Sequence, residues 1–153
     1  MTLGKTVMPK TIAALLAQRW FGVLARIFLT FAFWGSGLSK LIDFQGGVAE
    51  MASLDFEPAA GFNIAVIIVQ FGGSLLVILN RWTWLGAGAL AVFTALTIPL
   101  VHHFWTMEGP EAMVHFFFVA EHVSLIGGLM LVAILSRHST AAVSEGTRLY
   151  AKA

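Results

Sequence analysis

The stretch of this sequence that most constrains the fold runs from Trp20 to Ile42, about 23 residues of almost unbroken apolar character. It contains Arg26 toward one end and Lys40 toward the other, with the small residues 35–37 between them. A helix needs about 20 consecutive apolar residues to cross the hydrocarbon core of a bilayer, which is longer than a soluble core helix requires. The run therefore predicts a membrane-spanning helix.

The composition extends this prediction to the whole chain. Of the 153 residues, 58% are hydrophobic and only 11% are charged, whereas soluble domains carry roughly 25% charged residues. A surface so poor in charge must be solvated largely by lipid. The length predicts one bundle rather than two domains, and the absence of cysteine excludes disulfides, thiolate metal sites and a thiol relay of the chain's own.

Three further apolar segments complete a predicted bundle. The four spans are expected at about 20–42, 62–80, 82–104 and 113–135, followed by a cytoplasmic tail at 136–153. Each span carries a cluster of small residues, and such clusters let helices approach closely in lipid: Gly35-Ser36-Gly37, Gly72-Gly73-Ser74, Gly86-Ala87-Gly88 and Gly127-Gly128. The predicted fold class is all-α, an integral membrane four-helix bundle.

Two segments outside the spans are predicted to lie on the membrane surface. In residues 1–19, the spacing of Ile12, Leu15 and Leu16 after Pro9 favours an interfacial amphipathic helix. A cleaved signal peptide is the alternative, but the sequence after Ala17 is a poor cleavage site. In the loop after the first span, apolar residues at helical spacing favour a short surface helix.

The charges predict the orientation. One side of the membrane would hold these bases: Lys5, Lys10, Arg19, Arg81, Arg137, Arg148 and Lys152. The other would hold Lys40 and six acids: Asp43, Glu50, Asp55, Glu57, Glu108 and Glu111. Since basic loops stay inside, both termini are expected in the cytoplasm, with the spans in a bacterial inner membrane.

Several polar residues lie inside predicted spans, where a charge costs at least ~2.5–3.5 kcal/mol. We expect Arg26 on the first span to pair with Glu121 on the fourth, with Gln70 bridging them. Such a pair either fixes the helix register or lines a polar pocket for a head group, a quinone or a small anion. Lys40 is expected to snorkel to the interface and to pair with Asp43.

Four histidines belong to the third and fourth spans: His102, His103, His115 and His122. Imidazoles on facing helices bind metals or haem, but a diagnostic ligand spacing is absent. His102 and His103 also point about 100° apart on a helix. The sequence favours interfacial hydrogen bonding over a proton- or quinone-linked role, and both over metal or haem ligation. The predicted pocket and buried polar set consists of Arg26, Lys40, Gln70, His102, His103, Glu121 and His122.

These features resemble the DoxX family of small bacterial membrane proteins with four spanning helices. The matching residues are Arg26-Ile27, Gly37-Leu38-Ser39-Lys40-Leu41, Gly47 with Met51-Ala52-Ser53-Leu54, and His102-His103-Phe104-Trp105. Family members are associated with membrane redox complexes, one of them a thiosulfate:quinone oxidoreductase, and with oxidative-stress responses. Members often carry a glutamate where this chain has Gln70, which weakens a proton relay through the second span. The resemblance implies no defined catalytic residue.

Three functions follow as hypotheses. The first is an accessory or anchoring, non-catalytic subunit of a quinone-linked membrane redox system, with a redox protein as partner and a pocket for quinone or lipid. The second is a stand-alone enzyme or carrier for a lipophilic small molecule. The third is a structural module that assembles through its small residues with other membrane helices or with copies of itself. No feature of the sequence predicts nucleic-acid binding.

Overall fold

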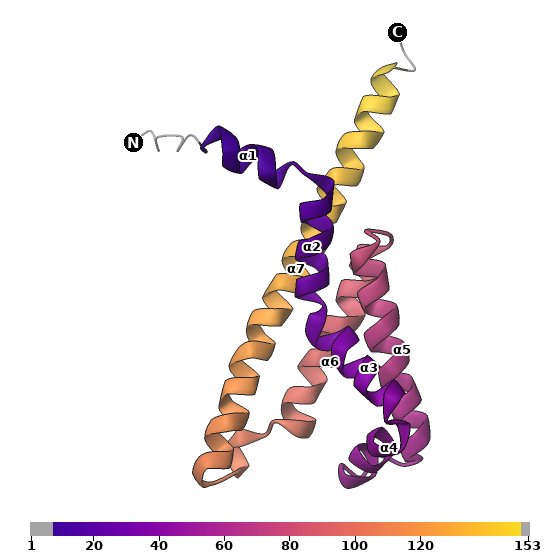
Figure 1. Ribbon diagram of the computed structural model, residues 1–153, viewed down its shortest axis with the longest axis vertical. Coiled ribbons are helices and arrows are strands. Elements are labelled where there is room, and N and C mark those ends of the chain that lie inside the picture. Colours follow the sequence, from indigo (N-terminus) through magenta and orange to yellow (C-terminus); the bar gives the residue numbers. More distant parts are fainter. Residues whose placement is uncertain (1–7, 151–153) are drawn as a thin grey trace.

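The structure is a computed structural model that describes residues 8–150, with side chains for residues 8–137. Over this range the chain forms helices joined by short turns (Figure 1). In order they are α1 (Lys10–Leu16), α2 (Arg19–Leu29), α3 (Phe31–Ile42), α4 (Phe44–Ser53), α5 (Ala59–Ile78), α6 (Thr83–Val101), the 3-10 turn η1 (Phe104–Thr106) and α7 (Gly109–Tyr150). The all-α prediction is confirmed.

Three helical segments of the described chain are long and apolar enough to cross a membrane: Ala59–Ile78, Thr83–Thr106 and Gly109–Arg137. They overlap the second, third and fourth predicted spans. In Figure 1, α1 and the last turns of α7 lie at one end of the molecule, called here the terminal end. The opposite end, where α4 lies and where α6 connects to α7, is called the far end.

The first predicted span is divided at Thr30 into α2 and α3. Thr30 is fully buried, with φ −95° and ψ 6°, and its hydroxyl donates to the Arg26 carbonyl at 2.8 Å. A side-chain bond to the preceding turn bends helices. The Trp34 indole N–H donates to the Ile27 carbonyl at 3.2 Å. Both carbonyls at the break thus keep a partner inside the protein, as hydrocarbon surroundings require.

The helices pack through the predicted small residues. A Cβ atom on Gly86 of α6 would lie 2.7 Å from the carbonyl oxygen of Gly73 on α5, so the two backbones touch. A Cβ on Gly128 of α7 would lie 2.8 Å from the Leu29 side chain of α2. Glycine at these positions permits the close helix contacts that stabilise membrane bundles. The apolar core beside them contains Phe33, Val77, Ala87, Leu90 and Leu129.

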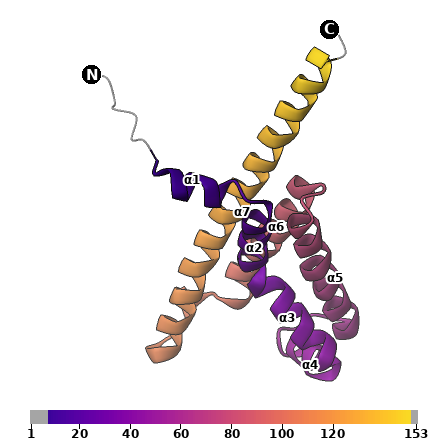
Figure 2. The same ribbon diagram turned by 45° about the horizontal axis from the view of Figure 1, so that its top comes forward.

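The two predicted surface segments both contain helices. Every residue of α1 is exposed, and α1 meets α2 at an angle of 67°. Together the two helices are long and apolar enough for a broken span or a re-entrant loop. Helix α4 folds back against α3 and α5 at the far end (Figure 2). Its N-terminus is capped by Asp43, whose carboxylate accepts from the Gly46 N–H at 2.9 Å.

The charges separate between the two ends. Lys10, Arg19, Arg81 and Arg137 belong to the segments at the terminal end. Lys40 and the six acids listed above belong to the far-end segments between α3 and α7. Lys5 and Lys152 lie outside the described residues, as does the side chain of Arg148.

Candidate functional site

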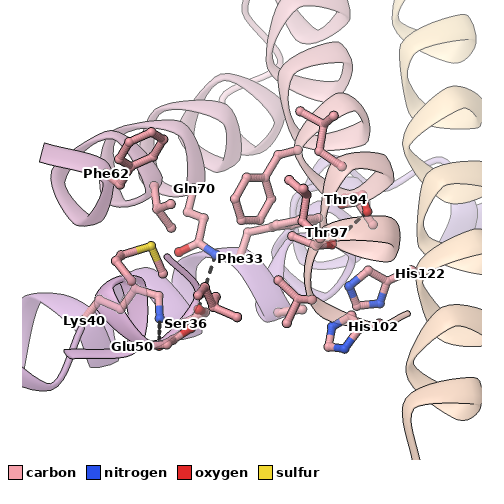
Figure 3. A pocket seen from close by; sticks show the side chains of 18 of the residues that line it. Phe33, Ser36, Lys40, Glu50, Phe62, Gln70, Thr94, Thr97, His102 and His122 are labelled. Carbon is pink, nitrogen blue, oxygen red and sulfur yellow. Dashed lines mark hydrogen bonds and ion pairs between the residues drawn. The ribbon is translucent and has the colours of Figure 1, made fainter. Parts of the chain in front are cut away.

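A cavity of about 420 Å³ opens between α3, α4, α5, α6 and α7 in the far half of the molecule. Its walls are predominantly apolar. Aromatic rings of Phe33, Phe56, Phe62 and Phe93 contribute to them. Polar groups enter at a few points, namely Ser36, Lys40, Glu50, Gln70, Thr94, Thr97, His102 and His122 (Figure 3). A large apolar cavity with a few convergent polar groups is the usual form of a small-molecule site.

Gln70 of α5 supplies a free polar atom to this cavity. The residue is 4% exposed, and its amide nitrogen donates to the Ser36 hydroxyl at 3.3 Å. Its amide oxygen is buried and has no partner. If the amide is turned over, the Ser36 hydroxyl satisfies the oxygen and the nitrogen is free instead. In either orientation one amide atom stays unpaired and buried at the cavity wall, which costs ~1–3 kcal/mol.

Lys40 reaches the cavity from α3 and pairs with Glu50 of α4. The Lys40 side chain is only 11% exposed. The expected pairing with Asp43 is wrong, because Asp43 caps α4 and the folding back of that helix brings Glu50 to the lysine. This ion pair joins α3 to α4 beside the cavity.

His102 and His122 lie across the cavity from Gln70 (Figure 3). Their rings meet edge to face with centroids 4.9 Å apart. On its other side, His102 contacts His115, with the two Nδ1 atoms 3.2 Å apart. In that contact one ring donates and the other accepts, so the pair holds one shared proton. The histidines thus form a continuous contact from the cavity wall to the first turns of α7.

His103 does not join this group. Its Nδ1 atom contacts the Thr106 hydroxyl at 2.8 Å, and its ring packs against Trp105. As for metal ligation, the described side chains contain no group of three or more His, Asp or Glu placed to hold an ion. The Nδ1 atoms of His102 and His115 point at each other rather than at a common centre.

The expected pairing of Arg26 with Glu121 is wrong. Leu29 and Gly128 touch, which fixes the register of α2 against α7. From that contact Arg26 lies three residues toward the terminal end and Glu121 seven residues toward the far end. At 1.5 Å per residue this separates them by about 15 Å. Glu121 is exposed on α7 and does not line the cavity; Arg26 lies outside it too.

Some cavity residues were missed by the sequence reasoning. Thr94 and Thr97 both face the cavity, although their hydroxyls are satisfied by carbonyls of α6, at 2.7 Å and 2.8 Å. The available signal was the spacing of Thr94, Thr97 and Val101, three and then four residues, because it marks one face of a helix. Glu50 and Met51 were assigned only to a surface helix, and nothing local in the sequence shows that α4 folds back.

The arrangement suits a flat, lipophilic molecule that carries hydrogen-bonding atoms on opposite edges. Aromatic and aliphatic walls would cover its faces, and aromatic pairs favour edge-to-face or offset contacts. The free amide atom of Gln70 would bind one edge and an imidazole nitrogen of the histidine pair the other. Both groups can donate or accept a hydrogen bond.

Comparisons with known proteins agree with a multi-pass protein of the inner membrane. A family model described as DoxX matches residues 21–103. The chain is also 29% identical, over 115 residues, to a protein of Escherichia coli (strain K12) named inner membrane protein YphA, with 73% of this chain and 80% of that protein covered. No solved structure matches. The family match includes the cavity-lining residues from α3 to α6, and leaves out those from α7.

Proposed function

This chain belongs to the DoxX family and is a multi-pass protein of the inner membrane. From this membership and from the cavity, we propose that it binds a quinone-type molecule for a membrane redox system. The observation that carries the proposal is the unpaired amide atom of Gln70 at the wall of a predominantly apolar cavity. The redox association comes from the family resemblance. The class of ligand is inferred from the apolar walls and the polar groups of the cavity.

Quinones match the polar groups of the cavity by their chemistry. A quinone presents two carbonyl oxygens on opposite edges of a flat ring, and its reduced form presents two hydroxyl groups there. The amide of Gln70 and the imidazole of His102 stand on opposite sides of the cavity (Figure 3). Each can donate to a carbonyl oxygen or accept from a hydroxyl, so the same site can hold both redox forms.

The histidines give protons a route to and from such a ligand. When a quinol hydroxyl loses its proton, the ring of His102 or His122 is the nearest acceptor on that side of the cavity. The Nδ1 contact between His102 and His115 passes the proton on toward the far end. Histidine suits this role because it exchanges protons near neutral pH.

Electrons must come from or go to another molecule, since the chain contributes no cysteine and no residue with a defined catalytic role. We therefore assign the chemistry to a redox protein partner, and this chain acts as the quinone-holding accessory subunit. Purification from the native membrane in mild detergent should recover a stoichiometric redox protein. Recovery of the chain alone, with quinone bound, would favour a carrier of lipophilic molecules instead.

The ligand itself is tested with the purified full chain. Short-chain ubiquinone and menaquinone analogues are titrated and followed by calorimetry. Replacing Gln70 by Leu, or His102 by Phe, removes one hydrogen bond of about 1 kcal/mol and should weaken affinity about fivefold. Gln45→Leu is the matched control, because Gln45 is exposed on α4 and does not line the cavity. Equal affinity in all four proteins would refute the quinone site.

The orientation is part of the proposal. Bases at the terminal end and acids at the far end support cytoplasmic termini, so the cavity and the histidines would lie in the periplasmic half. A reporter that fluoresces only in the cytoplasm should be bright when fused after residue 153 and dark when inserted at Met107, which lies in the far-end turn before α7. The reverse pattern would invert the topology.

A further inference from the structure

We propose that Arg26, together with Arg19, binds the phosphate group of a membrane phospholipid on the terminal side of the bilayer. This site is separate from the cavity and independent of the quinone proposal. It is built on one face of α2. The two arginines stand seven residues apart on that face, with Gly22 between them.

Arg26 is a charge inside the bilayer without a counter-ion. It is partly buried, and Val23, three residues before it on the neighbouring part of the helix surface, is 41% exposed. Its Nε atom is buried and has no partner. One terminal nitrogen makes a single long contact, 3.5 Å, to the Gly22 carbonyl of its own helix. A guanidinium has five N–H donors, so most of its capacity is unused.

No described carboxylate lies in reach of Arg26. Six of the acids belong to far-end segments, and the seventh, Glu121, is about 15 Å further along the bundle axis. The ion pair found among the described residues joins Lys40 to Glu50 at the far end. An unpaired charge at bilayer depth is costly. The missing anion is therefore expected from outside the described chain.

The geometry directs the guanidinium toward the terminal surface. A Cβ atom on Gly22 would lie 3.7 Å from the Arg26 terminal nitrogen, so the side chain extends along α2 over the glycine toward Arg19. Long basic side chains near helix ends extend in this way to the interface. Trp20 and Trp82, 57% and 72% exposed, mark the interface at this end. Arg26 lies six residues, about 9 Å, below Trp20.

A glycerophospholipid fits each part of this surface. Its phosphate would sit over Gly22 between the two guanidinium groups, which bind phosphate oxygens through paired N–H donors. Its acyl chains would run toward the far end beside the apolar residues that follow Arg26 in α2. The order of charge and apolar surface along α2 thus matches the order of head group and chains in a lipid.

The test uses the delipidated full chain in detergent. Dioleoylphosphatidylglycerol is added, and bound lipid is counted by native mass spectrometry together with the midpoint of thermal unfolding. The wild type should retain one lipid and unfold at a higher temperature. Arg26→Gln should weaken lipid binding about tenfold, the loss expected for one charge-assisted pair, and Arg26→Lys should fall between. Arg81→Gln, which removes one charge from the turn between α5 and α6, should leave binding unchanged.

Two further probes use the wild type alone, and they decide the question even if Arg26→Gln does not fold. Dioleoylglycerol has the same chains without the phosphate and should give no stabilisation. Inorganic phosphate should give none at millimolar concentration. Equal stabilisation by dioleoylglycerol would overturn the phosphate site. If inorganic phosphate stabilised the protein to the same degree, the proposal that the bound phosphate belongs to a lipid would be refuted. Undiminished binding by a folded Arg26→Gln protein would overturn the role of Arg26.

Discussion

Gln70→Leu should change stability and ligand affinity in opposite directions. Without ligand, one amide atom of Gln70 is buried and unpaired at 4% exposure, which costs ~1–3 kcal/mol. The substitution removes this cost and loses the 3.3 Å bond to Ser36, worth ~0.5–1.5 kcal/mol. The variant should therefore be about 1 kcal/mol more stable than the wild type in the ligand-free state, while quinone affinity falls.

Ser74→Ala is the matched control for this prediction. Ser74 lies on the same helix, is 1% exposed, and its hydroxyl is also buried without a partner. It does not line the cavity. Removing its hydroxyl should raise stability by a similar amount, about 1 kcal/mol, and leave quinone affinity unchanged.

The assay is reversible unfolding in mixed micelles with increasing dodecyl sulfate, followed by circular dichroism, with and without a quinone analogue. Ligand should shift the wild-type and Ser74→Ala transitions and should shift the Gln70→Leu transition less. A Gln70→Leu protein less stable than the wild type without ligand would refute the reasoning, because the amide would then be satisfied in the native state.

Two further substitutions test contacts between helices, one a close approach of two glycines and the other an ion pair. Gly86→Ala should lower stability by about 1–3 kcal/mol in the same unfolding assay, because its Cβ would meet the backbone oxygen of Gly73 at 2.7 Å. Gly88→Ala is its control and should be neutral, since nothing lies within 4 Å of that position. Glu50→Gln should lower stability by about 1 kcal/mol at neutral pH, because the Lys40 side chain, 11% exposed, loses its counter-charge. High salt should reduce that difference, and a salt-independent loss would point to packing instead.

The features that could be predicted are those that lipid imposes along a single helix. Apolar runs of about 20 residues mark α5, α6 and α7 because nothing shorter crosses the hydrocarbon core. Small residues mark helix contacts because they let helices approach closely in lipid, and Gly73 and Gly86 do touch. Among the polar residues predicted inside spans, Gln70, His102 and His122 line the cavity. Each of these predictions follows from the sequence of a single segment and from the lipid that surrounds it.

The features that could not be predicted depend on how two segments register. Arg26 and Glu121 have suitable charges, but the Leu29–Gly128 contact decides their depths and separates them. The partner of Lys40 follows from the fold of α4, which the local sequence does not encode. The break at Thr30 depends on the bond from its hydroxyl to the Arg26 carbonyl. The same residues could also form a continuous helix, so the sequence alone does not predict the break.

The interruption of the first span at Thr30 has a mechanical consequence. Across a continuous helix, a change of angle must stretch backbone hydrogen bonds. Here the Ile27 carbonyl is already bonded to the Trp34 indole rather than to the next turn of backbone. At the joint a side-chain bond therefore replaces one bond of the backbone ladder, while the Thr30 N–H and carbonyl keep their backbone partners. Helices α3 and α4, joined by the ion pair of Lys40 and Glu50, follow the break and form one wall of the cavity, and α7 contributes to another. The backbone at Thr30 thus sets the direction in which this wall leaves α2.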